Sequence, residues 1–500
     1  MVDNKELILR FNNLTLTGMN SLILNNMSNL LPLYIAIDEY LKSDICSIEQ
    51  SNKELCSQIV KIQLFVNYFY TLYVTSLNGA FNSKELREQQ AHLKYVNAYV
   101  IEGFKALWGY KSHSRTLLGK FKKIYIGTKD TDTFDNEIEL ITQRLNEYTN
   151  SDITDKDERD LTMHYQLDSG GSPKKLLKLD NITLEKELKR YEQFGEILRK
   201  LMNCITDLLE HYLFKKNREE LMNIVPILSP LTTKDLHAWK DKASEVESLI
   251  NNNINTQSNF FSICKKYLTK LPNIISQISN VYNIDPNDFN EILSVPETML
   301  ALSYMSIDLS AAIRKYFHSQ IPIERAIALS RMNIICNSII NRVYGYNSRK
   351  DSYWERYLIK PYVGCDLPDS LIEVKNLMEN CISNNLYSDN KRSVFVHLKE
   401  KNVVSAIKLL YSQNPFEEIN NSIEIVKVIH KTQNAIYESL KQIDNNNQVR
   451  NSDKYQWVDA YIAPYKDKKK ITPIYDLLME LKKGDMEEVL NIIKKNDLGK

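Results

Sequence analysis

Apolar side chains recur at steps of three and four along most of the chain, which is the spacing of one face of an α-helix. In the first half this pattern predicts helices over residues 1–45, 53–80, about 84–108 and about 138–145. The stretch from Gly109 to Asp132 is less regular. The longest apolar stripe runs from Leu184 to Tyr212 and predicts a long amphipathic helix, with Asn181 shortly before it.

The same spacing returns in the second half. It predicts a helical pair over about 234–282 and single helices over Thr298–Phe317, Ile323–Tyr344 and Ser370–Ile382. Another helix is expected to begin at Asn414-Pro415-Phe416-Glu417, because Asn can cap a helix, Pro fits its first turn and Glu follows three positions on. An Asn-rich stretch at 444–448 closes this unit, and residues 455–500 are expected to form a short helical tail.

An internal repeat relates the two halves. Trp108-Gly109-Tyr110 is answered by Tyr344-Gly345-Tyr346, and Tyr125-Ile126-Gly127 is answered by Tyr362-Val363-Gly364. Further on, Arg159 and His164 are answered by Arg392 and His397, so the offset in numbering stays between 233 and 237 throughout. The period is too long for a solenoid, so each copy is expected to be a whole domain of about 220 residues. One long helical array without separate cores is the alternative.

The predicted fold class is therefore all-α, with two tandem, similar helical-bundle domains and a helical C-terminal tail. We place the domains at 1–225 and 226–445 and the tail at 446–500. Limited proteolysis is expected to cut near 214–235 and 444–455 and to leave two resistant fragments.

Composition agrees with a helical, soluble protein. The chain has only 13 Gly and 13 Pro in 500 residues, and sheets joined by tight turns use more glycine than this. The net charge is +1, so any attraction to nucleic acid must come from a local patch. The seven cysteines form no Cys-x-x-Cys pair and predict free thiols in a reducing compartment. With no signal sequence and no long apolar stretch, we expect a cytoplasmic protein that has no membrane contact.

An Arg followed five positions later by His occurs three times in the chain. Arg87 and His92 lie inside a predicted helix, and the corresponding residues of the second copy are Ile323 and Ala328, so we interpret this match as fortuitous. The other two matches, 159–164 and 392–397, coincide under the repeat. Each of these follows a polar connector and precedes the last long helix of its copy.

A helical unit whose last long helix is preceded by such an Arg–His motif resembles the HEPN superfamily (higher eukaryotes and prokaryotes nucleotide-binding). Arg159-Asp160 with His164 is the better match, because the family often places Asp, Asn or His directly after the Arg. In the second motif, Arg392 and His397 are kept but Ser393 takes that position. The resemblance implies a ribonuclease of the abortive-infection or toxin type, with an antiviral defence role and a cellular RNA such as tRNA as its target.

The chemistry of the motif agrees with RNA cleavage without a metal or cofactor. An Arg guanidinium suits the oxygens of a phosphodiester, and a His can exchange protons with a ribose 2′-hydroxyl or a leaving oxygen near neutral pH. In the resembling family two motifs face each other across a dimer. Two units in one chain can form that composite groove alone, while a homodimer and a regulatory protein or nucleotide are further partners to expect. Asp160 and Ser393 are assigned supporting roles.

The alternative function is a non-catalytic helical scaffold that binds a nucleotide or a protein. Arg and His also cap helices and pair with acids without any catalysis. We interpret four other features as ordinary surface or structural features: the acidic connector 152–160, His113 beside Arg115, His318, and the basic run Lys466–Lys470.

Overall fold

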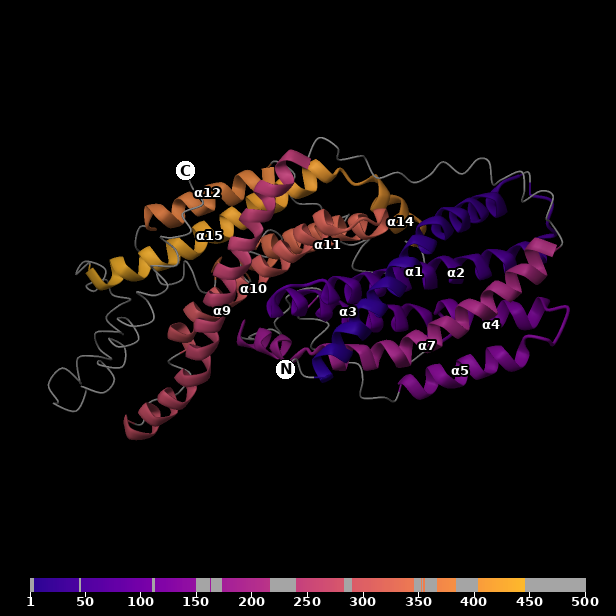
Figure 1. Ribbon diagram of the computed structural model, residues 1–500, viewed down its shortest axis with the longest axis horizontal. Coiled ribbons are helices and arrows are strands. Elements are labelled where there is room, and N and C mark those ends of the chain that lie inside the picture. Colours follow the sequence, from indigo (N-terminus) through magenta and orange to yellow (C-terminus); the bar gives the residue numbers. More distant parts are fainter. Residues whose placement is uncertain are drawn as a thin grey trace.

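The computed structural model describes the chain in segments. These are residues 4–44, 46–109, 113–149, 162, 173–215, 240–282, 290–345, 352, 354–355, 367–383 and 403–445. Every regular element within these segments is helical, and no strand occurs among them, which confirms the all-α prediction (Figure 1). The predicted tail 446–500 lies outside the described residues.

The described elements of the first half are α1 (Asn4–Lys42), α2 (Gln50–Phe81), α3 (Leu86–Leu107), α4 (Leu117–Thr128), α5 (Asp135–Thr149), the 3₁₀ helix η1 (Pro173–Asn181), α7 (Leu184–Leu209) and the π-helix η2 (Glu210–Phe214). α2 is the central helix of this half and packs against α1, α3, α4 and α7. Side chains on all sides of α2 are buried, as the nearly continuous apolar run in its sequence indicates.

The described elements of the second half are α9 (Lys240–Tyr282), α10 (Asn290–His318), α11 (Pro322–Ile339), the π-helix η6 (Ile340–Tyr344), α12 (Asp369–Ser383), α14 (Val403–Ser412) and α15 (Pro415–Asn445). α10 is the central helix here and packs against α9, α11 and α15. The order of the helices and their packing thus repeat those of the first half, with α10 in the place of α2 and α11 in the place of α3.

Two glycines mark equivalent helix ends. Gly109 follows α3 with a φ of 78°, and Gly345 follows η6 with a φ of 74°. A left-handed residue ends a helix by letting its N–H bond back to the preceding turn, and glycine adopts this conformation without a steric penalty. The N–H of Gly109 bonds to the carbonyl of Phe104, and that of Gly345 bonds to the carbonyl of Ile340. The prediction that a helix ends near Gly109 is therefore confirmed.

Capping side chains mark the first residues of other helices. The Thr116 hydroxyl accepts a hydrogen bond from the Gly119 N–H at the start of α4, and the Thr183 hydroxyl does the same for Lys186 at the start of α7. Such a cap stabilises a helix by about 1 kcal/mol. α15 begins at Pro415, directly after Asn414, as the sequence predicts.

The structure corrects two expectations. The stretch predicted to be less regular contains α4, whose Leu117, Leu118, Phe121 and Tyr125 form a buried face on α2 and α3. The helical pair expected over 234–282 is, over its described part, the single helix α9. α9 stays helical through Pro272 and packs along α10, and this tertiary packing outweighs the local preference of proline to break a helix.

A single hydrophobic core connects the two halves. The buried apolar residues form one cluster that runs from Leu24 in α1 to Ile436 in α15, with a small satellite of Ala91, Ile307 and Ala311 between α3 and α10. The existence of two separable domains stays a prediction, which the proteolysis experiment tests. None of the described helices is long and apolar enough to cross a membrane.

Candidate functional site

The six residues assigned to the two motifs lie outside the described part of the chain. They are Arg159, Asp160, His164, Arg392, Ser393 and His397. Thr162, between Arg159 and His164, is described as one buried helical residue. The distance between the two histidines therefore stays untested. The helices that follow the motifs in the sequence are described, and their packing shows which elements of the two halves lie against each other.

The element that follows each motif packs on the opposite half. η1, which follows the first motif, contacts α10 of the second half. α14, which follows the second motif, contacts α2 of the first half as well as α11 of its own half, and Figure 1 shows α14 close to α1 and α2. α2 and α10 are equivalent under the repeat. The contact of η1 with α10 therefore corresponds to the contact of α14 with α2, and in each case the two helices belong to different halves.

The other contacts between the halves are exchanged in the same way. α3 packs on α10 and α9, and, correspondingly, α11 packs on α2 and α1. An approximate two-fold relation between the halves produces this arrangement. The two motifs thus precede equivalent elements on opposite sides of one interface.

Two equivalent glutamates are buried at this interface. Glu88 in the first turn of α3 and Glu324 in the first turn of α11 are related by the period of the repeat. Glu88 forms a buried ion pair with Arg314 of α10, and Glu324 accepts a hydrogen bond from the Asn78 side chain of α2 (2.6 Å). Arg314 and Asn78 are related by the same offset in numbering, so the two contacts are equivalent, with an arginine on one side and an asparagine on the other.

Each glutamate has further donors. The backbone N–H of Lys84 donates to Glu88 (3.2 Å), and the ammonium group of Lys315 donates to Glu324 (2.7 Å). The hydroxyl of Ser319 also donates to Glu324. Burial lowers the pKa of Lys315, although the adjacent Glu324 carboxylate partly offsets this effect.

A fully buried ion pair lies between α3 and α10. Lys94 is 0% exposed and Asp308 is 1% exposed. The Lys94 ammonium also lies 4.7 Å from the ring centroid of Tyr304, which adds a cation–π contact. Burial lowers the pKa of Lys94, and the nearby Arg331 cation lowers it further. Such a pair contributes less to stability than its geometry suggests, because both ions lose their hydration on folding.

Arg331 of α11 lies near the centre of this interface and is buried. Its guanidinium lies 4.7 Å from the ring centroid of Tyr95, and these two residues are equivalent under the repeat. Equivalent residues that touch each other lie beside the two-fold axis. Arg331 also donates to Ser76 and contacts Nδ1 of His92 (3.3 Å). Burial lowers the pKa of His92 well below its usual range, and Arg331 lowers it further, so His92 is neutral at pH 7.

Ion pairs also hold the exchanged elements in place. Asp180 of η1 pairs with Arg87 of α3 and with Lys265 of α9 in the second half. Burial alone would raise the pKa of Asp180, but the hydrogen bonds from Lys265 and Arg87 outweigh it, so the pKa is lowered. On the other side Lys408 of α14 pairs with Glu39 of α1, where both side chains are about half exposed.

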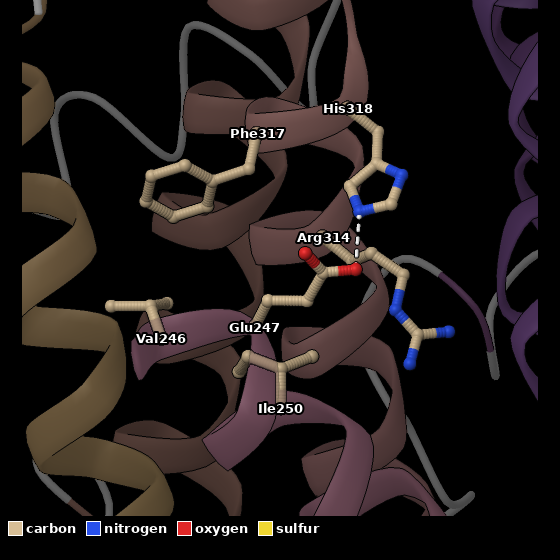
Figure 2. A pocket seen from close by; sticks show the side chains of 6 residues that line it. All are labelled: Val246, Glu247, Ile250, Arg314, Phe317 and His318. Atoms are coloured by element: carbon tan, nitrogen blue, oxygen red, sulfur yellow. Dashed lines mark hydrogen bonds and ion pairs between the residues drawn. The ribbon is translucent and has the colours of Figure 1, made fainter. Parts of the chain in front are cut away.

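The remaining histidines considered in the sequence have structural partners. Arg87 pairs with Asp180 of η1, whereas His92 is buried beside Arg331. His113 stacks on Trp108 with ring centroids 4.0 Å apart, and its Nδ1 lies 2.8 Å from the Trp108 carbonyl oxygen. His318 pairs with Glu247 (3.1 Å) beside Arg314, in the shallow surface depression that Figure 2 shows. The acidic connector and the basic run Lys466–Lys470 lie outside the described residues.

No group of three or more His, Cys, Asp or Glu side chains in the described segments is arranged to hold a metal ion. The six described cysteines are free, and five of them are buried. Burial raises the pKa of Cys264 to about 12 and that of Cys336 to about 12, so these two thiols stay protonated near neutral pH.

No protein-family model, curated protein or solved structure matches this chain.

Proposed function

We propose that the chain is a metal-independent endoribonuclease of the HEPN type, with one composite site formed by its two Arg–His motifs. The observation that supports this most is the exchange of η1 and α14 between the halves. η1 begins nine residues after His164 and α14 begins six residues after His397, so each motif is connected by a short segment to an element that contacts the opposite half. The helical fold and the repeated helix order also agree with two HEPN-like units in one chain.

The proposed reaction is cleavage of a phosphodiester by the adjacent ribose. One histidine takes the proton of the 2′-hydroxyl, and the 2′-oxygen attacks phosphorus. The bond from phosphorus to the 5′-oxygen breaks, and the other histidine gives a proton to that oxygen. The products are a 2′,3′-cyclic phosphate and a 5′-hydroxyl. Arg159 and Arg392 bind the non-bridging oxygens and stabilise their charge in the transition state.

The two motifs are proposed to contribute unequally. Asp160 carries a charge that favours the protonated imidazole of His164, whereas Ser393 supplies only a neutral hydrogen bond near His397. We therefore assign the larger share of the catalysis to His164, as the general acid. His397 is the weaker general base, and the second motif contributes more to phosphate binding. A cellular RNA such as tRNA is the proposed substrate, and growth arrest during phage infection is the proposed outcome.

The test is cleavage of labelled RNA by the purified chain with EDTA present. Changing His164→Ala is expected to lower the rate by roughly 10²–10⁴-fold, as for loss of a general acid or base, and His397→Ala by less. His211→Ala is the matched control, because His211 is a partly exposed histidine paired with Asp130 in the first half. Cleaved RNA should carry 2′,3′-cyclic phosphate ends.

Three results would overturn the proposal. These are cleavage that stops with EDTA, cleavage that survives loss of both motif histidines, and RNA that remains intact in the presence of the unmodified chain. Expression in growing cells gives a second measurement. Growth arrest that His164→Ala relieves supports the nuclease, whereas arrest that is indifferent to this change favours the non-catalytic scaffold.

A further inference from the structure

One surface helix of the first half lies in a stretch that has several basic side chains and no acidic one. Residues 115–129, which include α4, contain five basic side chains and no acidic one, whereas the whole chain has a net charge of only +1. The five are Arg115, Lys120, Lys122, Lys123 and Lys129. This is the kind of local patch that contact with a polyanion requires in a chain of balanced charge.

The cations of α4 divide between two flanks of the helix. Lys122 and Lys129 face α5 and its preceding loop, where they pair with Glu139 (3.4 Å) and Asp132 (2.6 Å). Lys120 and Lys123 lie on the other flank at a spacing of three, so they share one side of the helix. We call Lys120 and Lys123, together with the exposed Arg115 that precedes the helix, the α4 basic face.

Two of the three cations of the α4 basic face are exposed, and Lys120 is partly exposed. Arg115 and Lys123 are exposed, and neither has a carboxylate partner among the described residues. Ile126, next to this face, is 66% exposed. A Cβ added to Gly127 would meet no atom within 4 Å, so the last turn of α4 leaves room for another molecule to approach the backbone.

The internal repeat supplies a comparison that separates folding from binding. The equivalent stretch of the second copy, 352–366, keeps the Tyr-x-Gly landmark but has two basic and two acidic residues, a charge of zero against +5. The cations are therefore specific to the first copy, whereas the Tyr-x-Gly landmark is common to both. A feature found in one copy alone favours a role in binding over a role in the shared fold.

α2 connects α4 with the interface between the halves and fixes the distance between them. Gln58, near the start of α2, donates to the Leu117 carbonyl at the start of α4 (3.1 Å), whereas Asn78, near the end of α2, lies at the interface between the halves. Twenty residues of helix separate these two points by roughly 30 Å. Figure 1 shows α4 in the lobe away from α9 and α10.

We infer that the α4 basic face binds the phosphate backbone of an RNA substrate, at a point roughly 30 Å along α2 from the interface between the halves. The inference rests on the proposed function, because it takes RNA as the substrate. A dinucleotide is too short to reach from α4 to that interface. The substrate class is therefore a long or folded RNA, whose phosphates contact α4 while another phosphodiester of the same RNA binds at the two motifs.

The experiment compares two triple variants of the full chain. The test variant carries Arg115→Gln, Lys120→Gln and Lys123→Gln. The control carries Lys189→Gln, Lys427→Gln and Lys431→Gln, which removes the same charge from exposed positions elsewhere. Binding of a fluorescent tRNA is measured by anisotropy over a series of rising salt concentrations, in a background that also carries His164→Ala and His397→Ala to prevent cleavage.

The test variant is expected to bind tRNA roughly 10–100-fold more weakly at the lowest salt, while the control binds as the background does. Each lost phosphate contact lowers the slope of log affinity against log salt by about 0.7, so the slope should fall by about 2. In the cleavage assay, with the motif histidines present, KM for tRNA should rise with little change in kcat. Cleavage of the dinucleotide UpA should stay the same.

The outcomes separate this inference from the proposed function. If the test variant binds tRNA with the affinity and salt slope of the control, the inference is wrong, although cleavage that depends on His164 would still support the nuclease. If tRNA binding depends on the α4 basic face but no RNA is cleaved, the proposed nuclease is wrong and the binding surface stands. An equal loss of UpA and tRNA cleavage would also overturn the inference, because it would indicate an effect on the site itself.

Discussion

The buried ion pair between Lys94 and Asp308 gives the sharpest test of how the two halves are joined. Changing Lys94→Met leaves the methylene chain nearly intact but removes the charge opposite Asp308, whose side chain is only 1% exposed. A buried carboxylate that has lost its ammonium partner then remains between α3 and α10. Removing one partner of a buried pair typically destabilises a protein by about 3–5 kcal/mol.

The second change should restore most of this loss. In the variant with both Lys94→Met and Asp308→Leu no charge is left to desolvate, and replacing a buried pair by apolar residues is often neutral or stabilising. The double variant is therefore expected to lie within about 1 kcal/mol of the unmodified chain. A coupling of about 3 kcal/mol or more between the two sites follows from these values.

Urea unfolding followed by circular dichroism measures these differences. With a slope of about 5 kcal/mol per M, above that of small proteins because the chain is long, the Lys94→Met variant should unfold at a urea concentration roughly 0.5–1 M lower. The exposed pair Lys427–Glu424 is the control, and its double change should shift the midpoint very little. If Lys94→Met unfolds with the unmodified chain, or the double variant is as unstable as the single one, then the pair does not act as a buried, coupled pair.

Two further predictions concern stability. Burial lowers the pKa of His430 to about 4, so the folded state excludes its proton; stability should be complete above about pH 6.5 and fall by up to about 3 kcal/mol as the pH drops to 4. His430→Gln should flatten this pH profile of thermal unfolding, and an unchanged profile would contradict the assignment. Gly109→Ala and Gly345→Ala should each destabilise the chain by about 1–2 kcal/mol because φ is positive at both. Gly18→Ala, in an open position within α1, should instead be neutral or stabilising, and equal effects at all three glycines would refute the argument.

Much of the helical architecture was predictable from the sequence. Local signals are sufficient to predict a helix and its end where regularly spaced apolar positions adjoin a residue that caps or terminates a helix, as at Gly109 and Asn414. They failed for α4, since Gly119 and Gly127 lie within it, and what forms the helix is the packing of Phe121 and Tyr125 on the neighbouring helices. They failed also for α9, in which contacts with α10 along the helix outweigh Pro272. In both cases the tertiary packing determines that the segment is one helix, and the spacing of apolar residues in the sequence does not reveal that packing.

The interface was less predictable than the helices. The glutamates at 88 and 324 are visible in the sequence as a pair related by the repeat, yet nothing local indicates that their partners come from the opposite half. From the sequence alone, both resemble ordinary charges of a helix surface. Comparing the two copies position by position shows that Asn78 and Arg314 are equivalent too, and shared positions with different charges are a useful signal in any duplicated chain.

The covalent connection between the two halves has a consequence for how such a chain evolves. In a homodimer encoded by one gene, every substitution appears on both sides of the two-fold axis, so an arginine suited to one side must be tolerated on the other. Here Arg314 faces Glu88 while Asn78 faces Glu324, and Tyr95 meets Arg331 rather than a second tyrosine. Duplication within one polypeptide thus lets each side accept mutations independently, and the chain can acquire unequal surfaces without losing the association that holds its halves together.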